Sequence, residues 1–257
     1  MLLISTSSLK WYWLHKIFKI AKESNYDWID LVIENWNFDT FDQEYVKSLS
    51  DEFQVPVLSI TAPDKWLDKE KIDKIIKMST FLWSQVVNFS PPHITDKNMD
   101  WYLSYLSKLK WDLRISIAIQ NIEQKFLYFV IPEYKNSNLL DIKKITWDTA
   151  LNISNIDKTT WTDLMKMLWV LWSSIKNIYL SDKSWTKDWL VPWCASWWLS
   201  HLPLESFFMK LKNSWYNWFF SLKVKSQELW AWNDERVLDS LKLVKNYYKK
   251  HFIDFKP

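Results

Sequence analysis

Lys223 is the cation whose place in the sequence most directly suggests chemistry. It lies in the β-rich run Phe219–Lys225, on the alternate positions that do not hold the apolar side chains. An ammonium group that points into the interior of a fold is costly to bury unless it is paired. We expect Glu34 to supply the countercharge, with Asp182 as the alternative that is nearer in sequence. Such a lysine can polarise a carbonyl oxygen, act as a base with a lowered pKa, or form a structural ion pair, and the ion pair is the preferred interpretation.

Hydroxyl and amide side chains form a second group with a chemical use, because they can hydrogen-bond to a polyhydroxylated ligand. They occupy alternate positions in several other β-rich runs, and they are Ser59, Thr61, Asn88, Ser90, Ser116, Gln120, Asn152 and Ser154. His93 follows Pro91-Pro92 just after one of these runs and is the histidine best placed to reach a ligand. These residues therefore suit a polyhydroxylated ligand, with Asn88, Gln120, Ser154 and His93 among its contacts.

Eight β-rich runs must position these side chains. They are Leu2–Ser5, Ile29–Glu34, Val57–Thr61, Gln85–Ser90, Leu113–Gln120, Thr149–Ser154, Ile175–Ser181 and Phe219–Lys225. The runs that start at residues 29, 57, 85 and 113 are 28 residues apart, which suits one strand, one helix and two short loops. Apolar residues between the runs recur at the spacing of helices that pack against a sheet. Eight such units fill residues 1–257 without a linker, so we predict one α/β domain, a single (β/α)8 TIM barrel.

The alternation within each run predicts which side chains point inward. Ile115, Ile117 and Ile119 alternate with Ser116 and Gln120, for example. In a barrel with outer helices, the apolar positions face the helices and the more polar positions point inward. The inward side chains near the C-terminal ends of the strands line the mouth, where barrel enzymes place their sites. A solvated sheet face is the alternative explanation of the same pattern.

The chain has no glycine and 21 tryptophans. Average usage predicts roughly 18 glycines in a chain of this length, and the surplus of tryptophan is close to that number. Trp follows Asn or Asp where the turn dipeptides Asn-Gly and Asp-Gly are expected, at Asp27-Trp28, Asn35-Trp36, Asp100-Trp101, Asp188-Trp189 and Asn217-Trp218. We therefore hypothesise that the gene uses UGA for glycine and that UGA has been translated as tryptophan. The alternative is a truly Trp-rich chain whose rings stack on carbohydrate, and the sequence does not distinguish true tryptophans among the 21.

Composition excludes several classes of protein. A formal net charge of +3 is too small for a nucleic-acid binder. No apolar run approaches the roughly 18 residues of a membrane span, and the N-terminus lacks the pattern of a signal peptide. Cys194 is the single cysteine, so an internal disulfide and a multi-cysteine zinc site are excluded. We expect a cytoplasmic protein with no nucleic-acid and no membrane partner; its oligomeric state is not predicted.

Four segments carry a family pattern when tryptophan is replaced by glycine. They are the entry to the second strand, Tyr26-Asp27-Trp28-Ile29-Asp30, the strand from Ile175 to Asp182, the loop Leu190-Val191-Pro192-Trp193 and the turn Trp215-Tyr216-Asn217-Trp218. In these segments the chain resembles the xylose isomerase-like TIM barrels, the sugar phosphate isomerase/epimerase family. There a His-Leu-x-Asp strand, a Leu-Pro-x-Gly loop and a Gly-Tyr-x-Gly turn precede the last strand.

The resemblance implies a divalent metal held by carboxylates and histidines from strands five to eight. Such a metal polarises a sugar carbonyl while a proton moves at the adjacent carbon. The corresponding positions of this chain are Gln120, Ser154, Tyr179 and Lys223. We therefore expect no metal and no other cofactor, with Lys223 in place of the metal and Tyr179 as a ligand contact.

Two functions of different class remain open. The first is a divergent sugar (phosphate) isomerase or epimerase that moves a proton near a carbonyl, with Lys223, Glu34 and Asp182 as its catalytic candidates. The second is a non-catalytic TIM-barrel pseudoenzyme that kept the fold and a binding or structural role. Whether the chain is an enzyme is therefore not predicted from the sequence.

Overall fold

Eight parallel strands close into a barrel. In order around the barrel they are β1 (Leu2–Ser5), β12 (Phe219–Leu222), β9 (Ile175–Leu180), β8 (Thr149–Asn152), β5 (Ser116–Gln120), β4 (Val86–Phe89), β3 (Val57–Thr61) and β2 (Ile29–Val32). The computed structural model describes residues 1–94, 96, 104–109, 114–123, 125–128, 130–135, 143–144, 148–156, 161–184, 187–192 and 202–255. Each predicted β-rich run contains one barrel strand, so the predicted (β/α)8 TIM barrel is confirmed.

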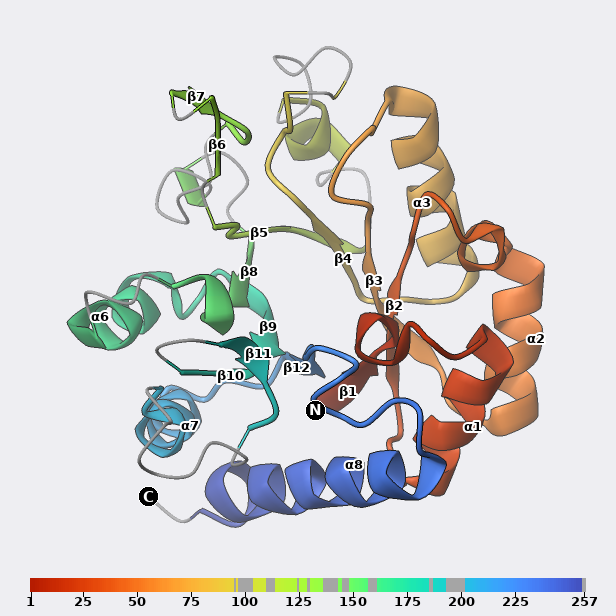
Figure 1. The fold of residues 1–257 in the computed structure, drawn as a ribbon. Helices are drawn as coiled ribbons and strands as arrows, with labels where there is room; N and C mark the ends of the chain where they lie inside the picture. Colours follow the sequence, from red (N-terminus) through yellow and green to blue (C-terminus); the bar gives the residue numbers. More distant parts are fainter. Residues whose placement is uncertain are drawn as a thin grey trace.

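Helices surround the strands on the outside of the barrel (Figure 1). They are α1 (Leu14–Glu23), α2 (Gln43–Phe53), α3 (Lys69–Phe81), α6 (Trp161–Leu171), α7 (Leu204–Asn213) and α8 (Asp234–Tyr248), and residues 104–109 are also helical. The side chains of Asp42, Asp68 and Asn233 accept hydrogen bonds from the first backbone N–H groups of α2, α3 and α8. A cap of this kind stabilises a helix by about 1 kcal/mol. No described helix has the length and the apolar content needed to cross a membrane.

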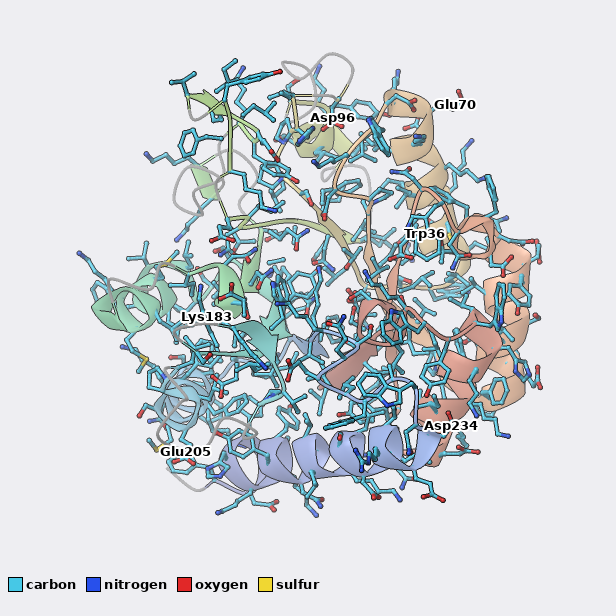
Figure 2. The ribbon with its side chains drawn as sticks, viewed as in Figure 1. Trp36, Glu70, Asp96, Lys183, Glu205 and Asp234 are labelled. Atoms are coloured by element: carbon cyan, nitrogen blue, oxygen red, sulfur yellow. The ribbon has the colours of Figure 1, made fainter. Side chains whose placement is uncertain are left out.

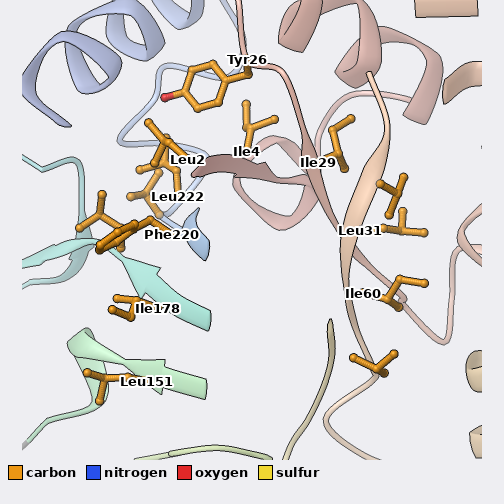
Figure 3. Close-up of a cluster of buried hydrophobic side chains, with 14 of the residues drawn as sticks. Leu2, Ile4, Tyr26, Ile29, Leu31, Ile60, Leu151, Ile178, Phe220 and Leu222 are labelled. Atoms are coloured by element: carbon orange, nitrogen blue, oxygen red, sulfur yellow. The ribbon is translucent and has the colours of Figure 1, made fainter. Parts of the chain in front are cut away.

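The main hydrophobic core lies between the strands and the helices. Figure 3 shows buried side chains of the barrel strands, with Leu2 and Ile4 of β1 beside Phe220 and Leu222 of β12. Tyr26 packs onto the same cluster from the segment before β2. The apolar positions of the strands therefore face outward to the helices, as the alternation predicted.

The inside of the barrel is filled by a smaller apolar cluster and by polar side chains. The apolar cluster contains Leu3, Val86, Ala118, Ala150, Tyr179 and Phe219. The fully buried polar group contains Asp30, Ser59, Asn88, Asn177 and Ser221. These polar residues occupy the inward positions predicted from the alternation, so a solvated sheet face is excluded for these strands.

Five strands end earlier than the sequence predicts, and in β2 and β12 the difference affects a predicted catalytic residue. β2 ends at Val32 and β12 ends at Leu222, so Glu34 and Lys223 follow their strands instead of lying in them. Lys223 still donates its backbone N–H to the Leu180 carbonyl at 3.0 Å, which keeps it beside β9. Glu34 instead donates its N–H to Thr40 Oγ1 at 3.1 Å, because the chain has already turned away from the barrel.

Eight described residues have a positive φ angle, and five of them are tryptophans. The five are Trp66, Trp83, Trp189, Trp215 and Trp230, with φ between 56° and 63°. This left-handed region is uncommon for residues other than glycine, asparagine and aspartate. No described tryptophan belongs to the buried core.

Candidate functional site

Asp30 is a carboxylate enclosed within the barrel. It comes from β2, it is fully buried, and its Oδ1 accepts hydrogen bonds from Ser59 Oγ at 2.7 Å and Thr61 Oγ1 at 3.0 Å. Burial raises the pKa of Asp30, while the Ser59 hydrogen bond and the charge of Lys223 oppose that rise. Asp30 is the one carboxylate within the eight barrel strands, all of which are described.

Lys223 lies at the C-terminal end of the barrel, above this carboxylate. Its side chain is partly buried, and its Nζ lies 4.4 Å from the centroid of the Tyr179 ring and 5.5 Å from that of the Trp189 ring. A cation in this position is attracted by the electron-rich face of an aromatic ring. The charge of Lys223 also stabilises the ionised form of Asp30. Lys223 is therefore inside the mouth, as predicted.

The predicted partner of Lys223 is wrong. Neither Glu34 nor Asp182 forms an ion pair with Lys223 within 4.0 Å, and the carboxylate electrostatically linked to it is Asp30. Glu34 does not pair with Lys223 because β2, whose alternation was used to predict an inward side chain, already ends at Val32. Asp182 begins the two-residue strand β10 (Asp182–Lys183), where its Oδ1 accepts the Lys183 N–H at 2.7 Å.

Glu34 lies near a different lysine. Burial raises the pKa of this partly buried carboxyl, and the nearby charge of Lys10 opposes that rise. Lys10 and Lys223 line the same cavity, as described below. Glu34 is therefore linked to the cavity through Lys10, although it does not line the cavity itself.

Tyr179 is buried below Lys223. Its hydroxyl shares a hydrogen bond of 2.8 Å with Thr61 Oγ1, which is itself a donor to Asp30. Burial, followed by the charge of Asp30, raises the pKa of Tyr179 well above its usual value. Tyr179 is fully buried, so it acts on the mouth through Lys223 and Thr61 instead of offering a free hydroxyl.

Asn88 belongs to a hydrogen-bond network across the barrel interior. Its Nδ2 donates to Ser59 Oγ at 2.7 Å, and Ser221 Oγ donates to Asn177 Oδ1 at 3.0 Å. Asn177 Nδ2 donates to Ser59 Oγ at 3.4 Å, which connects the Asn88–Ser59 hydrogen bond to the Ser221–Asn177 hydrogen bond. The network fixes the Ser59 hydroxyl that donates to Asp30.

Gln120 lies in a second polar cluster at the ends of β3, β4 and β5. Its Nε2 donates to Ser90 Oγ at 2.8 Å and lies 3.4 Å from Asp64 Oδ1, which also accepts from Ser90 at 2.5 Å.

His93 follows Ser90 by three residues and is buried. Its Nε2 lies 3.7 Å from Glu133 Oε2, and its ring centroid lies 4.9 Å from that of Tyr134. Burial lowers the pKa of His93, and so does the charge of Lys65.

Ser154 lies in a third cluster, after β8. It hydrogen-bonds to Ser181, and its carbonyl accepts from Lys183 Nζ at 2.7 Å. Lys183 is buried and forms an ion pair with Asp188 Oδ1 at 3.3 Å. In Figure 2 it lies in the interior, whereas Glu205 and Asp234 lie at the periphery. The predicted ligand contacts thus divide among separate clusters.

A cavity of about 390 Å³ opens beside Lys223. Its walls come from the segments that follow β1 and β12 and from β11 (Asp188–Leu190), and they are Ser7, Lys10, Trp11, Trp189, Lys223, Val224, Lys225, Ser226 and Gln227. Of the predicted site residues only Lys223 lines it. Sequence reasoning did not select Lys10, because it lies in the segment after β1 where no alternation applies. It placed Lys225 at the end of the run Phe219–Lys225 but gave it no role.

The residues at the four positions implied by the resemblance do not fit a divalent metal. They offer an amide, a hydroxyl, a buried phenol and an ammonium group, and the ammonium of Lys223 repels a cation. In the described part of the chain, no three His, Cys, Asp or Glu side chains come together in a group that could hold a metal ion. Asp157, His201 and Cys194 lie outside the described residues.

The barrel is similar to solved structures of sugar-converting proteins and their relatives. The apo form of a 3-keto-D-glucoside 4-epimerase from E. coli has a TM-score of 0.67 at 12% identity, over 95% of this chain and 98% of that one. A xylose isomerase domain protein from Alicyclobacillus acidocaldarius has a TM-score of 0.68 at 13% identity, over 98% and 99%. A D-tagatose 3-epimerase-like protein has a TM-score of 0.62 at 16% identity, over 96% and 98%.

No family model and no curated protein matches the sequence. The structural similarity shows the class of fold: the chain forms a (β/α)8 barrel similar to that of a xylose isomerase domain protein.

Proposed function

We propose that the protein binds a small sugar or polyol at the C-terminal mouth of the barrel and acts on it as an isomerase or epimerase that uses Lys223 where a metal is usual. The observation that carries this proposal is the position of Lys223, which lines a cavity on one side and lies over Tyr179 and Asp30 on the other. The epimerases with a similar fold support the substrate class.

Lys223 is the proposed electrophile. Its ammonium group donates a hydrogen bond to the carbonyl oxygen of the bound sugar and stabilises the negative charge that grows there as a proton leaves the adjacent carbon. Asp30 is a positioning residue, since it is sealed beneath the mouth and acts on the ligand through Lys223. The ring of Tyr179 lies beneath the same ammonium group and attracts its charge.

Glu34 is the proposed base. Its carboxylate accepts the proton from the carbon next to the carbonyl, and the C–H electron pair becomes the double bond of the enolate. Return of a proton from solvent to the other face of that carbon gives the epimer. Return of a proton to the former carbonyl carbon gives the isomer, provided that the hydroxyl proton of the first carbon moves to the former carbonyl oxygen. The raised pKa of Glu34 suits this role, because a base works best when its pKa is near the working pH. Asp182 keeps a structural role at the start of β10 in this scheme.

A non-catalytic binding protein is the second candidate. The observation in its favour is that Gln120, Ser154 and Asn88 are buried and already hydrogen-bonded to protein partners. These groups then serve the architecture of the barrel, and the ligand contacts are confined to the cavity beside Lys223.

Solvent hydrogen exchange separates the two candidates. A panel of ketoses and aldoses is incubated with the protein in D₂O, and deuterium next to the carbonyl is followed by NMR. The enzyme proposal expects exchange that Lys223→Met and Glu34→Gln both abolish, and that Lys19→Gln on the outer face of α1 leaves unchanged. Binding without exchange supports the non-catalytic candidate. Tight stoichiometric binding of Mn²⁺, Mg²⁺ or Zn²⁺ in a titration would contradict the role given to Lys223.

A further inference from the structure

The cavity beside Lys223 is rich in positive charge. Among the described residues, three lysines line it, Lys10, Lys223 and Lys225, and no aspartate or glutamate does. We infer that this cavity holds an anionic group of the ligand, a phosphate ester or a carboxylate. The inference deepens the proposed function, because it assigns the substrate to the charged sugars, and it depends on that proposal only for the place of the ligand.

The neighbouring carboxylates leave this charge incompletely neutralised. Glu228, close in sequence to Lys225, pairs instead with Lys187 at 3.7 Å. No cavity lysine forms an ion pair within 4.0 Å with any carboxylate that the structure describes. Asp30 is electrostatically linked to Lys223 and Glu34 to Lys10, and burial makes both carboxyl groups harder to ionise.

Hydrogen-bond donors complement the lysines. Ser7, Ser226 and Gln227 line the cavity with hydroxyl and amide groups. The turn after β12 is closed by a hydrogen bond of 2.9 Å from the Glu228 N–H to the Lys225 carbonyl. Within the described residues, the backbone N–H groups of Ser226 and Gln227 inside this turn donate no hydrogen bond. Consecutive free N–H groups beside lysines are a suitable environment for an anion.

The size of the cavity is compatible with this occupant. A volume of about 390 Å³ lies within the range of small-ligand sites. Of the lysines that line it, Lys223 is partly buried and Lys225 is exposed. A sugar carbonyl at Lys223 therefore leaves the anionic end of the molecule beside Lys225 and Lys10.

The test measures the binding of inorganic phosphate and of acetate to the full chain by titration calorimetry, at low and at physiological salt. The variants are Lys10→Gln and Lys225→Gln, with Lys19→Gln as the control that removes the same charge from the outer face of α1. We expect phosphate or acetate to bind, each cavity variant to weaken the binding roughly tenfold, and the control to leave it unchanged. Tighter binding of phosphate identifies the anionic group of the ligand as a phosphate ester, and tighter binding of acetate identifies it as a carboxylate.

The outcomes separate this inference from the proposed function. Anion binding that responds to Lys10 and Lys225, without hydrogen exchange in any sugar phosphate or sugar acid, supports the anion site and contradicts the catalytic proposal. Exchange in neutral sugars, with no binding of phosphate or acetate, overturns the anion site and leaves the catalytic proposal intact. Equal loss of anion affinity in Lys19→Gln would also overturn the site, because it shows only a general effect of charge.

A second inference rests on the backbone and is independent of the cavity. Trp83 and Trp215 follow helices α3 and α7, and both are highly exposed, at 82% and 90%. The Trp83 N–H donates to the Thr80 carbonyl, and the next N–H, of Ser84, donates to Ser79. Trp215 and Trp230 repeat this pair of hydrogen bonds. The pattern is the Schellman motif, whose left-handed residue is usually glycine.

We infer that these tryptophan positions, and those of Trp66 and Trp189, are glycine in the natural protein. A chain with no glycine that places five of its described tryptophans in the left-handed region, and none in its core, is explained by UGA read as glycine. Replacing Trp11 and Trp189 by glycine would widen the cavity and leave its three lysines in place.

Peptide mass mapping of the natively produced protein tests this inference position by position. We expect glycine in the peptides that contain residues 83, 215 and 230. Tryptophan at these three positions would overturn the inference, and the same map identifies any true tryptophans among the remaining positions.

Discussion

The Lys223 ammonium lies 4.4 Å from the ring centroid of Tyr179, and the Tyr179 hydroxyl is bonded to the same Thr61 that donates to Asp30. This chain of contacts runs from the cavity to the one carboxylate of the barrel strands. The charge of Lys223 is therefore coupled to Asp30, which is fully buried and cannot contact a ligand.

Replacing Lys223 by methionine should stabilise the protonated form of Asp30. The methionine keeps an apolar stem over Tyr179 but removes the charge that favours the ionised carboxylate, so the pKa of Asp30 should rise further. The pKa is measured from the carboxyl carbon shift of Asp30 in NMR spectra across a pH series. An unchanged pKa would show that Lys223 and Asp30 are not coupled, and Lys225→Met serves as the matched variant at another lysine of the cavity.

Asp30 should make the protein less stable as the pH rises. Its folded pKa is raised above the unfolded value of about 3.9, so the folded state keeps a proton that the unfolded state has released. The free energy of unfolding therefore falls from about pH 4 upward until the folded pKa is passed. The Asp30→Asn side chain cannot titrate. The free energy of unfolding of this variant, measured with a denaturant, should therefore increase across this pH window relative to that of the unsubstituted chain.

Asp234 provides a control of opposite sign. The hydrogen bond from Lys16, followed by that from Tyr12, lowers the pKa of this exposed carboxyl. Its stabilising effect is therefore present above the unfolded pKa and is lost as the pH falls through the lowered one. Asp234→Asn should be the less stable variant at neutral pH, and the difference should shrink in acid.

The rate of hydrogen exchange should fall in acid as Glu34 gains a proton. A base must be ionised, and burial raises the pKa of Glu34, so the loss of rate should occur above the usual range of a glutamate. The pH profile of kcat/KM measures this pKa. Lys10→Gln should move the profile to higher pH, because the charge of Lys10 favours the ionised form. A profile that does not respond to Lys10 would assign the titration to another group.

Trp83→Gly should stabilise the chain by about 1–2 kcal/mol, the cost of holding a side chain with a Cβ atom in the left-handed region. Trp13→Gly is the matched control, because Trp13 is similarly exposed at 79% but has an extended backbone with φ of −65°. The control should gain nothing. Denaturant unfolding of both variants measures the difference, and equal changes would remove the backbone argument for glycine at Trp83.

The alternation of side chains along each strand determined most of the fold. A strand whose apolar positions face helices and whose polar positions face inward is specified locally, so the eight strands and the polar interior could be predicted. Asp30 could have been chosen by the same rule, since it holds an inward position in β2 and no other carboxylate lies in a barrel strand. The choice of Glu34 failed because alternation was extended past the end of β2 at Val32.

The pairing of charges was decided by the tertiary structure. Closing the barrel brings Lys223 over Tyr179 and Asp30, which are 44 and 193 residues away in sequence. The cavity lysines come together because β1 pairs with β12, which places the loop that carries Lys10 beside Lys225. Residue type and strand period are local properties of a sequence, but the distance between two loops depends on how the sheet closes.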